Sequence, residues 1–206
     1  MRSIWVICGG KSSEHDISIS SARNVVPALV DAAFSVSVVY IDRLGAWYHL
    51  SSECFMQSTN LNGIDISQAQ RLAVLPGAVR CFYKLDQPQE SLVCDVVFSL
   101  VHGGQGEDGD LQGFLNCLSV PFVGSDVLGS SICMAKHVTK ALLDSAGIAT
   151  VPGVVVNRGN YKDYDFEHVC KQLGCEEIFV KPSACGSSIG VTRVRQAADF
   201  ECAIAE

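Results

Sequence analysis

The feature that most constrains the fold is an apolar run that ends in two glycines near the N-terminus. Residues 4–8 (IWVIC) are all apolar and precede Gly9 and Gly10, as in a buried parallel strand that ends in a turn. Apolar residues then recur with helical spacing over residues 19–33, and residues 36–42 (VSVVYID) form a second apolar run. Strand, helix and strand in this order predict a βαβ unit, and therefore an α/β protein with an open parallel sheet.

Composition indicates a compact protein of one or two domains. The 206 residues are 48% hydrophobic and 18% charged, which argues against disorder. The net charge is −7 and no run of lysine and arginine occurs, so we expect no nucleic-acid partner. The apolar run at the N-terminus is too short for a signal peptide or a membrane span. We therefore expect a cytoplasmic protein with no membrane partner.

The ten cysteines raise the possibility of disulfides or a zinc site, but the sequence contains no CxxC pair. Several, such as Cys8, lie within apolar runs. We interpret them as small buried hydrophobic residues of a protein in a reducing compartment.

The middle of the chain predicts a sheet edge and then a further buried strand. Residues 43–90 contain short strand-like runs, with turn residues at Asn62–Gly63 and Pro76–Gly77. We interpret this stretch as an insertion or a sheet edge. Residues 95–101 (DVVFSLV) predict another buried strand, and apolar spacing predicts a helix from Asp110.

Two polar residues are expected at one edge of the predicted sheet. Glu14 follows the first strand, and His102 follows the strand over residues 95–101. Open α/β sheets bind ligands at the carboxyl ends of their strands, where a carboxylate can hold an amine. Two simpler interpretations stay open: Glu14 favours the positive end of the helix dipole, and His102 satisfies local backbone groups.

The second half of the chain contains a candidate phosphate-binding loop within residues 178–194. A short strand ends at Lys181, a loop carries Gly186, Ser187 and Ser188, and a second strand follows. Glycine lets the backbone approach a ligand closely, amides and hydroxyls donate to anionic oxygens, and the lysine adds positive charge. The alternative is an ordinary hairpin with a glycine and serine loop.

Helical spacing places Met134 and Leu142 on one side of a single helix that ends before Gly147. Lys136, near the start of that helix, is by itself compatible with a solvated surface residue. A further helix is predicted to end at Gly174.

Two nucleotide-binding motifs are disfavoured. The GGKS stretch at residues 9–12 suggests a P-loop, but that motif requires glycine at the position of Trp5. No GxGxxG follows residues 4–8, which argues against a dinucleotide-binding dehydrogenase.

Four stretches in a fixed order together resemble the D-alanine:D-alanine ligase family of the ATP-grasp superfamily. They are GGKSSEHDISISSA (9–22), HGGQGEDGDLQGFL (102–115), PFVGSDVLGSSICMAKHVTK (121–140) and VKPSACGSSIGVTRV (180–194). The resemblance implies an N-terminal Rossmann-like substrate-binding domain over residues 1–123 and the start of a central ATP-grasp domain over residues 124–206. It also implies ATP-dependent ligation of two D-alanines, through a D-alanyl acyl phosphate, for peptidoglycan synthesis.

The same resemblance implies a role for each candidate residue. Glu14 would bind the ammonium of the first D-alanine, His102 would line that pocket, and Ser187 would join a hydrogen-bonded group with Glu14 and a tyrosine. Lys136, Lys181, Gly186, Ser187 and Ser188 would hold ATP. Magnesium is the implied cofactor, with ligands beyond residue 206, so we expect little activity from this stretch alone. A homodimer through the N-terminal domain is also implied.

Alternative functions stay open at this point. A D-alanine:D-lactate ligase differs chiefly beyond residue 206, and a noncatalytic ATP-grasp-like binding module would keep the fold without the chemistry. A P-loop kinase is a third possibility, in which Lys11 rather than Lys181 would carry phosphate binding.

Overall fold

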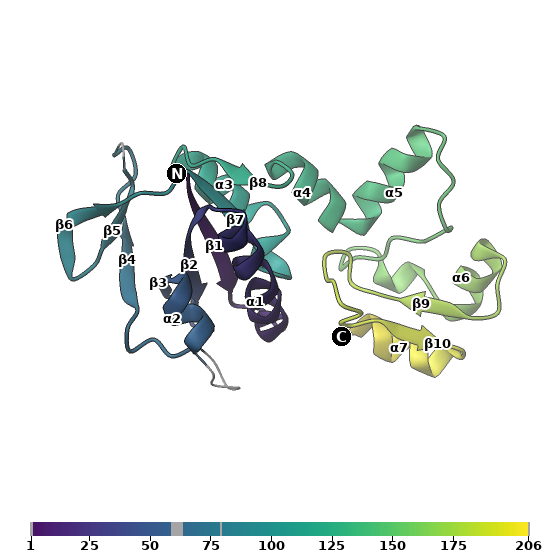
Figure 1. Cartoon of the computed structure of the whole chain (residues 1–206). Helices are drawn as coiled ribbons and strands as arrows, with labels where there is room; N and C mark the ends of the chain where they lie inside the picture. The colour runs from purple at the N-terminus through teal and green to yellow at the C-terminus, as the bar shows by residue number, and fades with distance from the viewer. Residues whose placement is uncertain (1, 59–63, 79, 206) are drawn as a thin grey trace. The chain divides into compact units, whose positions relative to one another are not determined.

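The computed structural model describes residues 2–58, 64–78 and 80–205. It divides into two compact units, an N-terminal unit over Met1–Ser131 and a C-terminal unit over Ile132–Glu206 (Figure 1).

The N-terminal unit is built on an eight-stranded sheet of order β6-β5-β4-β3-β2-β1-β7-β8. The strands are β1 (Ser3–Gly9), β2 (Ser35–Ile41), β3 (Trp47–Ser51), β4 (Gln70–Val74), β5 (Phe82–Lys84), β6 (Gln87–Leu92), β7 (Val96–Ser99) and β8 (Phe122–Val123). Strand β1 pairs in parallel with β2 on one side and β7 on the other, and β8 continues the parallel block. Helix α1 (His15–Asp31) connects β1 to β2. The predicted βαβ unit and the α/β fold class are confirmed.

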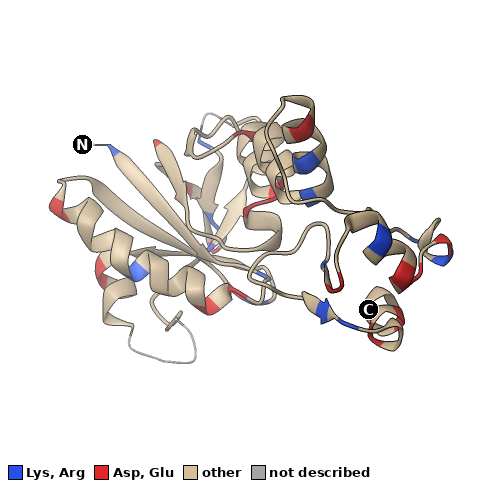
Figure 2. Ribbon diagram, turned by 90° about the vertical axis from the view of Figure 1, so that its right-hand side faces the viewer, with Lys and Arg blue, Asp and Glu red and all other residues tan. Residues whose placement is uncertain are grey.

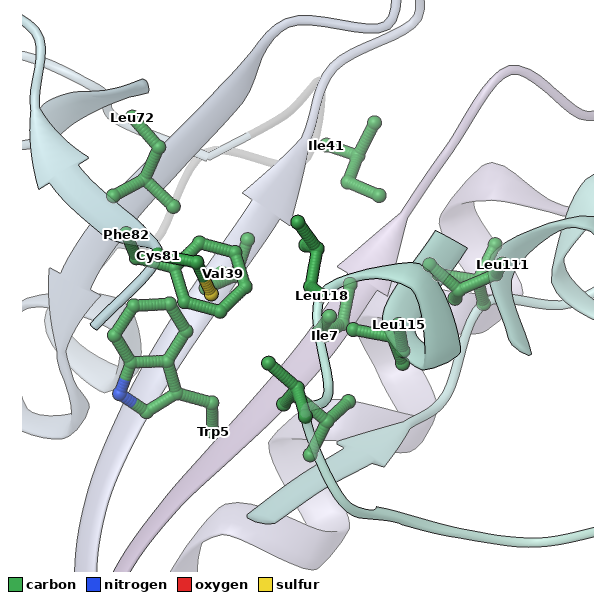
Figure 3. Close-up of a cluster of buried hydrophobic side chains, with 13 residues drawn as sticks. Trp5, Ile7, Val39, Ile41, Leu72, Cys81, Phe82, Leu111, Leu115 and Leu118 are labelled. Atoms are coloured by element: carbon green, nitrogen blue, oxygen red, sulfur yellow. The ribbon is translucent and has the colours of Figure 1, made fainter. Parts of the chain in front are cut away.

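Both faces of this sheet are covered by helices. Side chains alternate between the faces along each central strand, so each strand contributes to both cores. On β1, Val6 and Cys8 join the core under α1 and α2 (Ser52–Gln57), whereas Trp5 and Ile7 join the core under α3 (Asp110–Cys117). The Trp5 ring packs against the Phe82 ring (Figure 3), and their centroids are 4.7 Å apart. The parallel strands are therefore apolar on both sides, as the unbroken run at residues 4–8 predicted.

Residues 43–90 extend the sheet in the antiparallel sense. Strands β3 to β6 pair each with the next, and β3 pairs with β2, so the interpretation as a sheet edge is confirmed. The predicted turn at Asn62–Gly63 lies outside the described residues. At the other predicted turn, Gly77 has a φ of 82° and lies between β4 and β5.

The C-terminal unit contains α5 (Lys136–Ser145), α6 (Phe166–Leu173), the antiparallel pair β9 (Ile178–Val180) and β10 (Thr192–Val194), and α7 (Ala197–Ala205). Its core is small and centres on four buried side chains, which are Val169, Ile178, Val194 and Phe200. The two predicted helix stops are confirmed, because Gly147 and Gly174 have φ values of 74° and 67°.

The single helix predicted through Met134 and Leu142 is wrong. Helix α4 (Val127–Met134) ends at Met134, the next residue, Ala135, is extended with a ψ of 92°, and α5 begins at Lys136. The break frees the Lys136 amide to donate to the carbonyl of Ser183 at 3.0 Å, a partner far along the chain. A tertiary hydrogen bond has replaced a helical one.

Lysine and arginine residues are dispersed along the ribbon, as Figure 2 shows. Within the described part of the chain, no helix combines the length and apolar character needed to cross a membrane.

Candidate functional site

The carboxyl end of β1 turns sharply against the neighbouring strand. Gly9 and Gly10 have φ values of 87° and 102°, in the left-handed region that favours glycine. A Cβ atom on Gly9 would lie 2.2 Å from the carbonyl oxygen of Ile41, so no side chain fits there. The turn delivers Glu14 to the N-cap position of α1.

Glu14 is tied to the loop that follows β7. Its amide donates to Ser12 Oγ at 3.1 Å, and the Ser12 hydroxyl donates to the carbonyl of His102 at 2.7 Å. A Cβ atom on Gly103 would lie 2.6 Å from Glu14 Oε2, so the half-buried carboxylate lies directly against the Gly103 backbone. The loops after β1 and β7 therefore meet at one sheet edge, with Glu14 and His102 both on it.

His102 is positioned by a contact with α1. Its Nε2 atom lies 3.0 Å from Ser21 Oγ, and its ring is half-buried. One ring nitrogen therefore has a fixed partner. The roles of Glu14 and His102 toward a ligand stay predictions.

Two further residues, which the sequence analysis passed over, support this edge. Ser18 is fully buried, accepts a hydrogen bond from the Gly9 amide at 2.8 Å and donates to the carbonyl of Leu100 at 2.5 Å. His15 is 1% exposed, and its Nδ1 atom lies 2.7 Å from the carbonyl oxygen of Gly10, an atom that can only accept. The spacing of both residues with Ile19 on the inner face of α1 was the signal that could have identified them.

The loop between β9 and β10 carries the second group of predicted residues. Lys181 is the first residue after β9 and is exposed. Ser187 and Ser188 both have positive φ values, 54° and 59°, a conformation that costs a non-glycine residue roughly 1–2 kcal/mol. A Cβ atom on Gly190 would lie 2.7 Å from Pro182 Cγ, so the loop folds back onto its own beginning.

Lys136 is held at the same loop by direct contacts. Its ammonium donates to the carbonyl of Cys185 at 2.5 Å and approaches that of Ser183 at 3.4 Å. The adjacent His137 places Nδ1 2.6 Å from Ser183 Oγ. The start of α5 and the loop thus form one assembly in the C-terminal unit, and phosphate binding by Lys136 and Lys181 stays a prediction.

The other cations on this hairpin are already paired. Arg193 and Arg195 both contact the carboxylate of Glu177, and the hydrogen bond from Arg193 is the main cause that lowers the pKa of Glu177. Lys181 and Lys136 are therefore the cations best placed to meet an anion at the loop.

A magnesium ion is bound in proteins mainly by oxygen ligands such as carboxylates. Among the described residues, no three side chains of histidine, cysteine, aspartate or glutamate form a group that could hold a metal ion. These residues therefore do not fit magnesium by themselves.

Two family models match the chain and decide its membership. Residues 3–125 match the D-ala D-ala ligase N-terminus, and residues 142–206 match the D-ala D-ala ligase C-terminus. The chain belongs to the D-alanine–D-alanine ligase family. The resemblance carried by the four sequence stretches is confirmed.

Curated relatives support the same membership over nearly the whole chain. The D-alanine–D-alanine ligase of Proteus mirabilis is 37% identical over 204 residues, which are 98% of this chain and 56% of the relative. The D-alanine–D-alanine ligase A of Escherichia coli K12 is 38% identical over an alignment of 208 residues, which covers 98% of this chain and 56% of the relative. The chain therefore spans a little over half the length of these D-alanine–D-alanine ligases.

Solved structures agree with the fold. The D-alanine–D-alanine ligase of Coxiella burnetii matches with a TM-score of 0.85 and 34% identity, over 100% of this chain and 60% of that one. The VanG D-Ala:D-Ser ligase of Enterococcus faecalis matches with a TM-score of 0.81 and 31% identity, over 99% and 58%.

Proposed function

We propose that the whole protein joins two D-alanines into D-alanyl-D-alanine for peptidoglycan synthesis, with ATP as the energy source. The observation that carries this proposal is the match of both the N-terminal and the C-terminal family models to one chain. The first D-alanine carboxylate would attack the γ-phosphate of ATP, releasing ADP and forming a D-alanyl phosphate. The amine of the second D-alanine would then attack the acyl carbon and displace phosphate.

In the N-terminal unit, Glu14 would bind the ammonium of the first D-alanine. The contact of its carboxylate with Gly103 and the bridge from Ser12 to His102 support this role, because they hold a negative charge in a fixed place before substrate arrives. His102, fixed by Ser21, would line the same pocket.

In the C-terminal unit, Lys181 and Lys136 would neutralise the phosphates of ATP. Charge on the transferred phosphoryl group has to be offset in the transition state, and positioned cations do this well. Consecutive backbone amides in turns of positive φ form concavities for anions, which supports a role for Gly186, Ser187 and Ser188 in the loop. A role for Ser187 toward the first D-alanine belongs to the same proposal.

Several further features belong to the same proposal. Magnesium would accompany ATP through ligands outside the described residues. A substrate-binding domain over residues 1–123 would precede an ATP-grasp domain that starts at residue 124, and two copies would pair through the N-terminal domain. A cytoplasmic location belongs to the same proposal, because a small buried cysteine such as Cys8 is typical of a protein in a reducing compartment.

The test is phosphate release by the full gene product with ATP, magnesium and D-alanine. Lys181→Ala should lower kcat/KM at least about 100-fold, because a cation that offsets transition-state charge is lost. Lys11→Ala is the matched control and should change kcat/KM less than about threefold. The stem of Lys11 packs on Gly45, and Lys11 is not part of the loop between β9 and β10. The reverse order would favour a P-loop enzyme and refute the proposal.

The identity of the second substrate is tested by competition. The VanG neighbour is named a D-Ala:D-Ser ligase, so D-serine and D-lactate should each be offered against D-alanine. Predominant D-alanyl-D-alanine supports the proposal, and predominant formation of either mixed product refutes it. Glu14→Gln should raise the dissociation constant of D-alanine measured by calorimetry, a readout that does not depend on turnover.

A further inference from the structure

The end of α6 brings two cysteines together in a chain segment to which the proposed reaction assigns no role. Helix α6 ends at Leu173, and Gly174 takes the left-handed conformation with φ 67° and ψ 37°. The amides of Gly174 and Cys175 both turn back to the carbonyl of Cys170, the latter at 3.1 Å. The bond from the Cys175 amide is the 6→1 hydrogen bond of a Schellman motif, in which the side chains corresponding to Cys170 and Cys175 frequently make contact.

The two thiols are close enough to influence each other. Burial is the main cause that raises the pKa of Cys170, and the adjacent Cys175 thiol is the second. The backbone hydrogen bond between the two residues keeps their Cα atoms close, and a disulfide requires a separation of about 4.4–6.8 Å. Cys175 is exposed and Cys170 is half-buried, so an oxidant reaches Cys175 first.

We propose that Cys170 and Cys175 form a reversible intramolecular disulfide, which makes the end of α6 an oxidation site for small disulfides such as oxidised glutathione. The Cys175 thiolate attacks one sulfur of glutathione disulfide and releases one glutathione thiolate. The Cys170 thiolate then attacks Cys175 Sγ and releases the second glutathione. The protein loses two electrons and two protons, and the glutathione disulfide gains both.

Two cysteines of the N-terminal unit, Cys81 and Cys94, lack the exposed thiol that Cys175 has. Cys81 is buried and Cys94 lies half-buried against the same core, so a bulky disulfide does not reach either thiol first. Cys202 on α7 is exposed and serves as the comparison thiol.

The position of the pair gives its oxidation a structural consequence. Val169 of α6 and Ile178 of β9 share the small core of the C-terminal unit, and Lys181 follows β9 directly. A covalent link at the end of α6 would brace the short connection from the helix to this strand.

The experiment exposes the folded protein to oxidised glutathione, blocks the remaining thiols and digests it with trypsin. Cleavage after Lys171 separates Cys170 from Cys175, so the proposed disulfide links two peptides. We expect this linked pair to exceed the Cys175–glutathione mixed disulfide at least about tenfold, because the second thiol is held in place. A dithiol reductant should reverse the link.

Variants decide the assignment. Cys175→Ser should abolish the linked pair, and Cys170→Ser should leave Cys175 as the mixed disulfide. Cys185 lies on the same peptide as Cys175, since Pro182 blocks cleavage after Lys181, so Cys185→Ser has to retain the link. Cys202→Ser is the matched exposed control and should also retain it.

Two results would overturn the proposal. One is a mixed disulfide at Cys175 as abundant in the wild type as in Cys170→Ser, and the other is loss of the link in Cys185→Ser. Serine at the half-buried position of Cys170 could disturb the fold. Cys170→Ala, checked for an unchanged circular dichroism spectrum, therefore repeats the test without a hydroxyl there.

Discussion

The N-terminal unit holds its candidate site residues through buried partners, whereas the C-terminal unit holds its own through an exposed loop. Glu14 follows a strand buried on both faces, and the fully buried Ser18 joins the ends of β1 and β7 beneath it. Lys181 and Ser187 are exposed and lie on a loop between strands of three residues each. This difference favours the proposed roles, in which Glu14 belongs to a preformed amino-acid site and Lys181 to an adaptable phosphate loop.

The largest expected effect comes from core truncation in each unit. Trp5→Ala and Phe200→Ala should each cost about 3–5 kcal/mol of unfolding free energy, because both rings are almost fully buried. Both tryptophans, Trp5 and Trp47, belong to the N-terminal unit, so tryptophan fluorescence follows that unit alone. In urea, Phe200→Ala should shift the circular dichroism transition and leave the fluorescence transition in place. Equal shifts in both signals would show that the units unfold together and would break the comparison.

Acid should weaken the N-terminal unit through His49. Burial first, and the charge of Lys84 second, lower the pKa of His49 to about 4. Its unfolded pKa is about 6.5, so as pH falls from about 6.5 toward 4 the unfolded chain binds a proton that the folded chain resists. Stability should therefore fall by up to about 1.4 kcal/mol per pH unit in this window and be unaffected by His49 above it.

The control for this pH dependence is His49→Phe, which keeps a ring against Trp5, 5.2 Å away in the wild type. Urea titrations followed by fluorescence should give a shallower pH slope for the variant. An identical slope would assign the acid sensitivity to other groups.

Removing a serine hydroxyl should destabilise the N-terminal unit more than the C-terminal unit. Ser18→Ala should cost about 1–3 kcal/mol, because the Gly9 amide and the Leu100 carbonyl both lose a buried partner. Ser183→Ala removes an exposed hydroxyl that contacts His137 and should cost less than about 0.5 kcal/mol. Chemical denaturation of both variants provides the measurement, and equal costs would contradict the contrast drawn between the units.

The smallest expected effect is a gain in stability in the C-terminal unit. Ser188→Gly should stabilise it by at most about 1 kcal/mol, since glycine adopts a φ of 59° without strain. Ser183→Gly is the matched control, because it replaces a serine of the same loop outside the residues with positive φ. A stability gain of equal size in the control, measured by circular dichroism in urea, would remove strain as the explanation.

Local signals were sufficient for much of the fold. The apolar run at residues 4–8 predicted a strand buried on both faces, and glycine predicted the ends of two helices at Gly147 and Gly174. These features depend on neighbours a few residues away, so the sequence contains them directly. Glu14 and His102 were expected at one edge because parallel strands align their carboxyl ends, and the pairing of β1 with β7 puts them there.

Features that depend on distant partners were not predictable. The break at Ala135 coincides with a bond from the Lys136 amide to the Ser183 carbonyl, and the same two segments tie the Lys136 ammonium to the loop. Ser18 acquires its importance only when Gly9 and Leu100 lie on either side of it.

By itself, the sequence determined the α/β class, the family and the order of the candidate site residues, because periodicity, glycine positions and motif spacing are properties of the chain. Only the tertiary structure decided which backbone groups those residues meet: Gly103 against the Glu14 carboxylate, and the carbonyl of Cys185 against Lys136. Such contacts join segments separated by dozens of residues. They arise when hydrophobic burial closes the loops between them, and no local pattern encodes them.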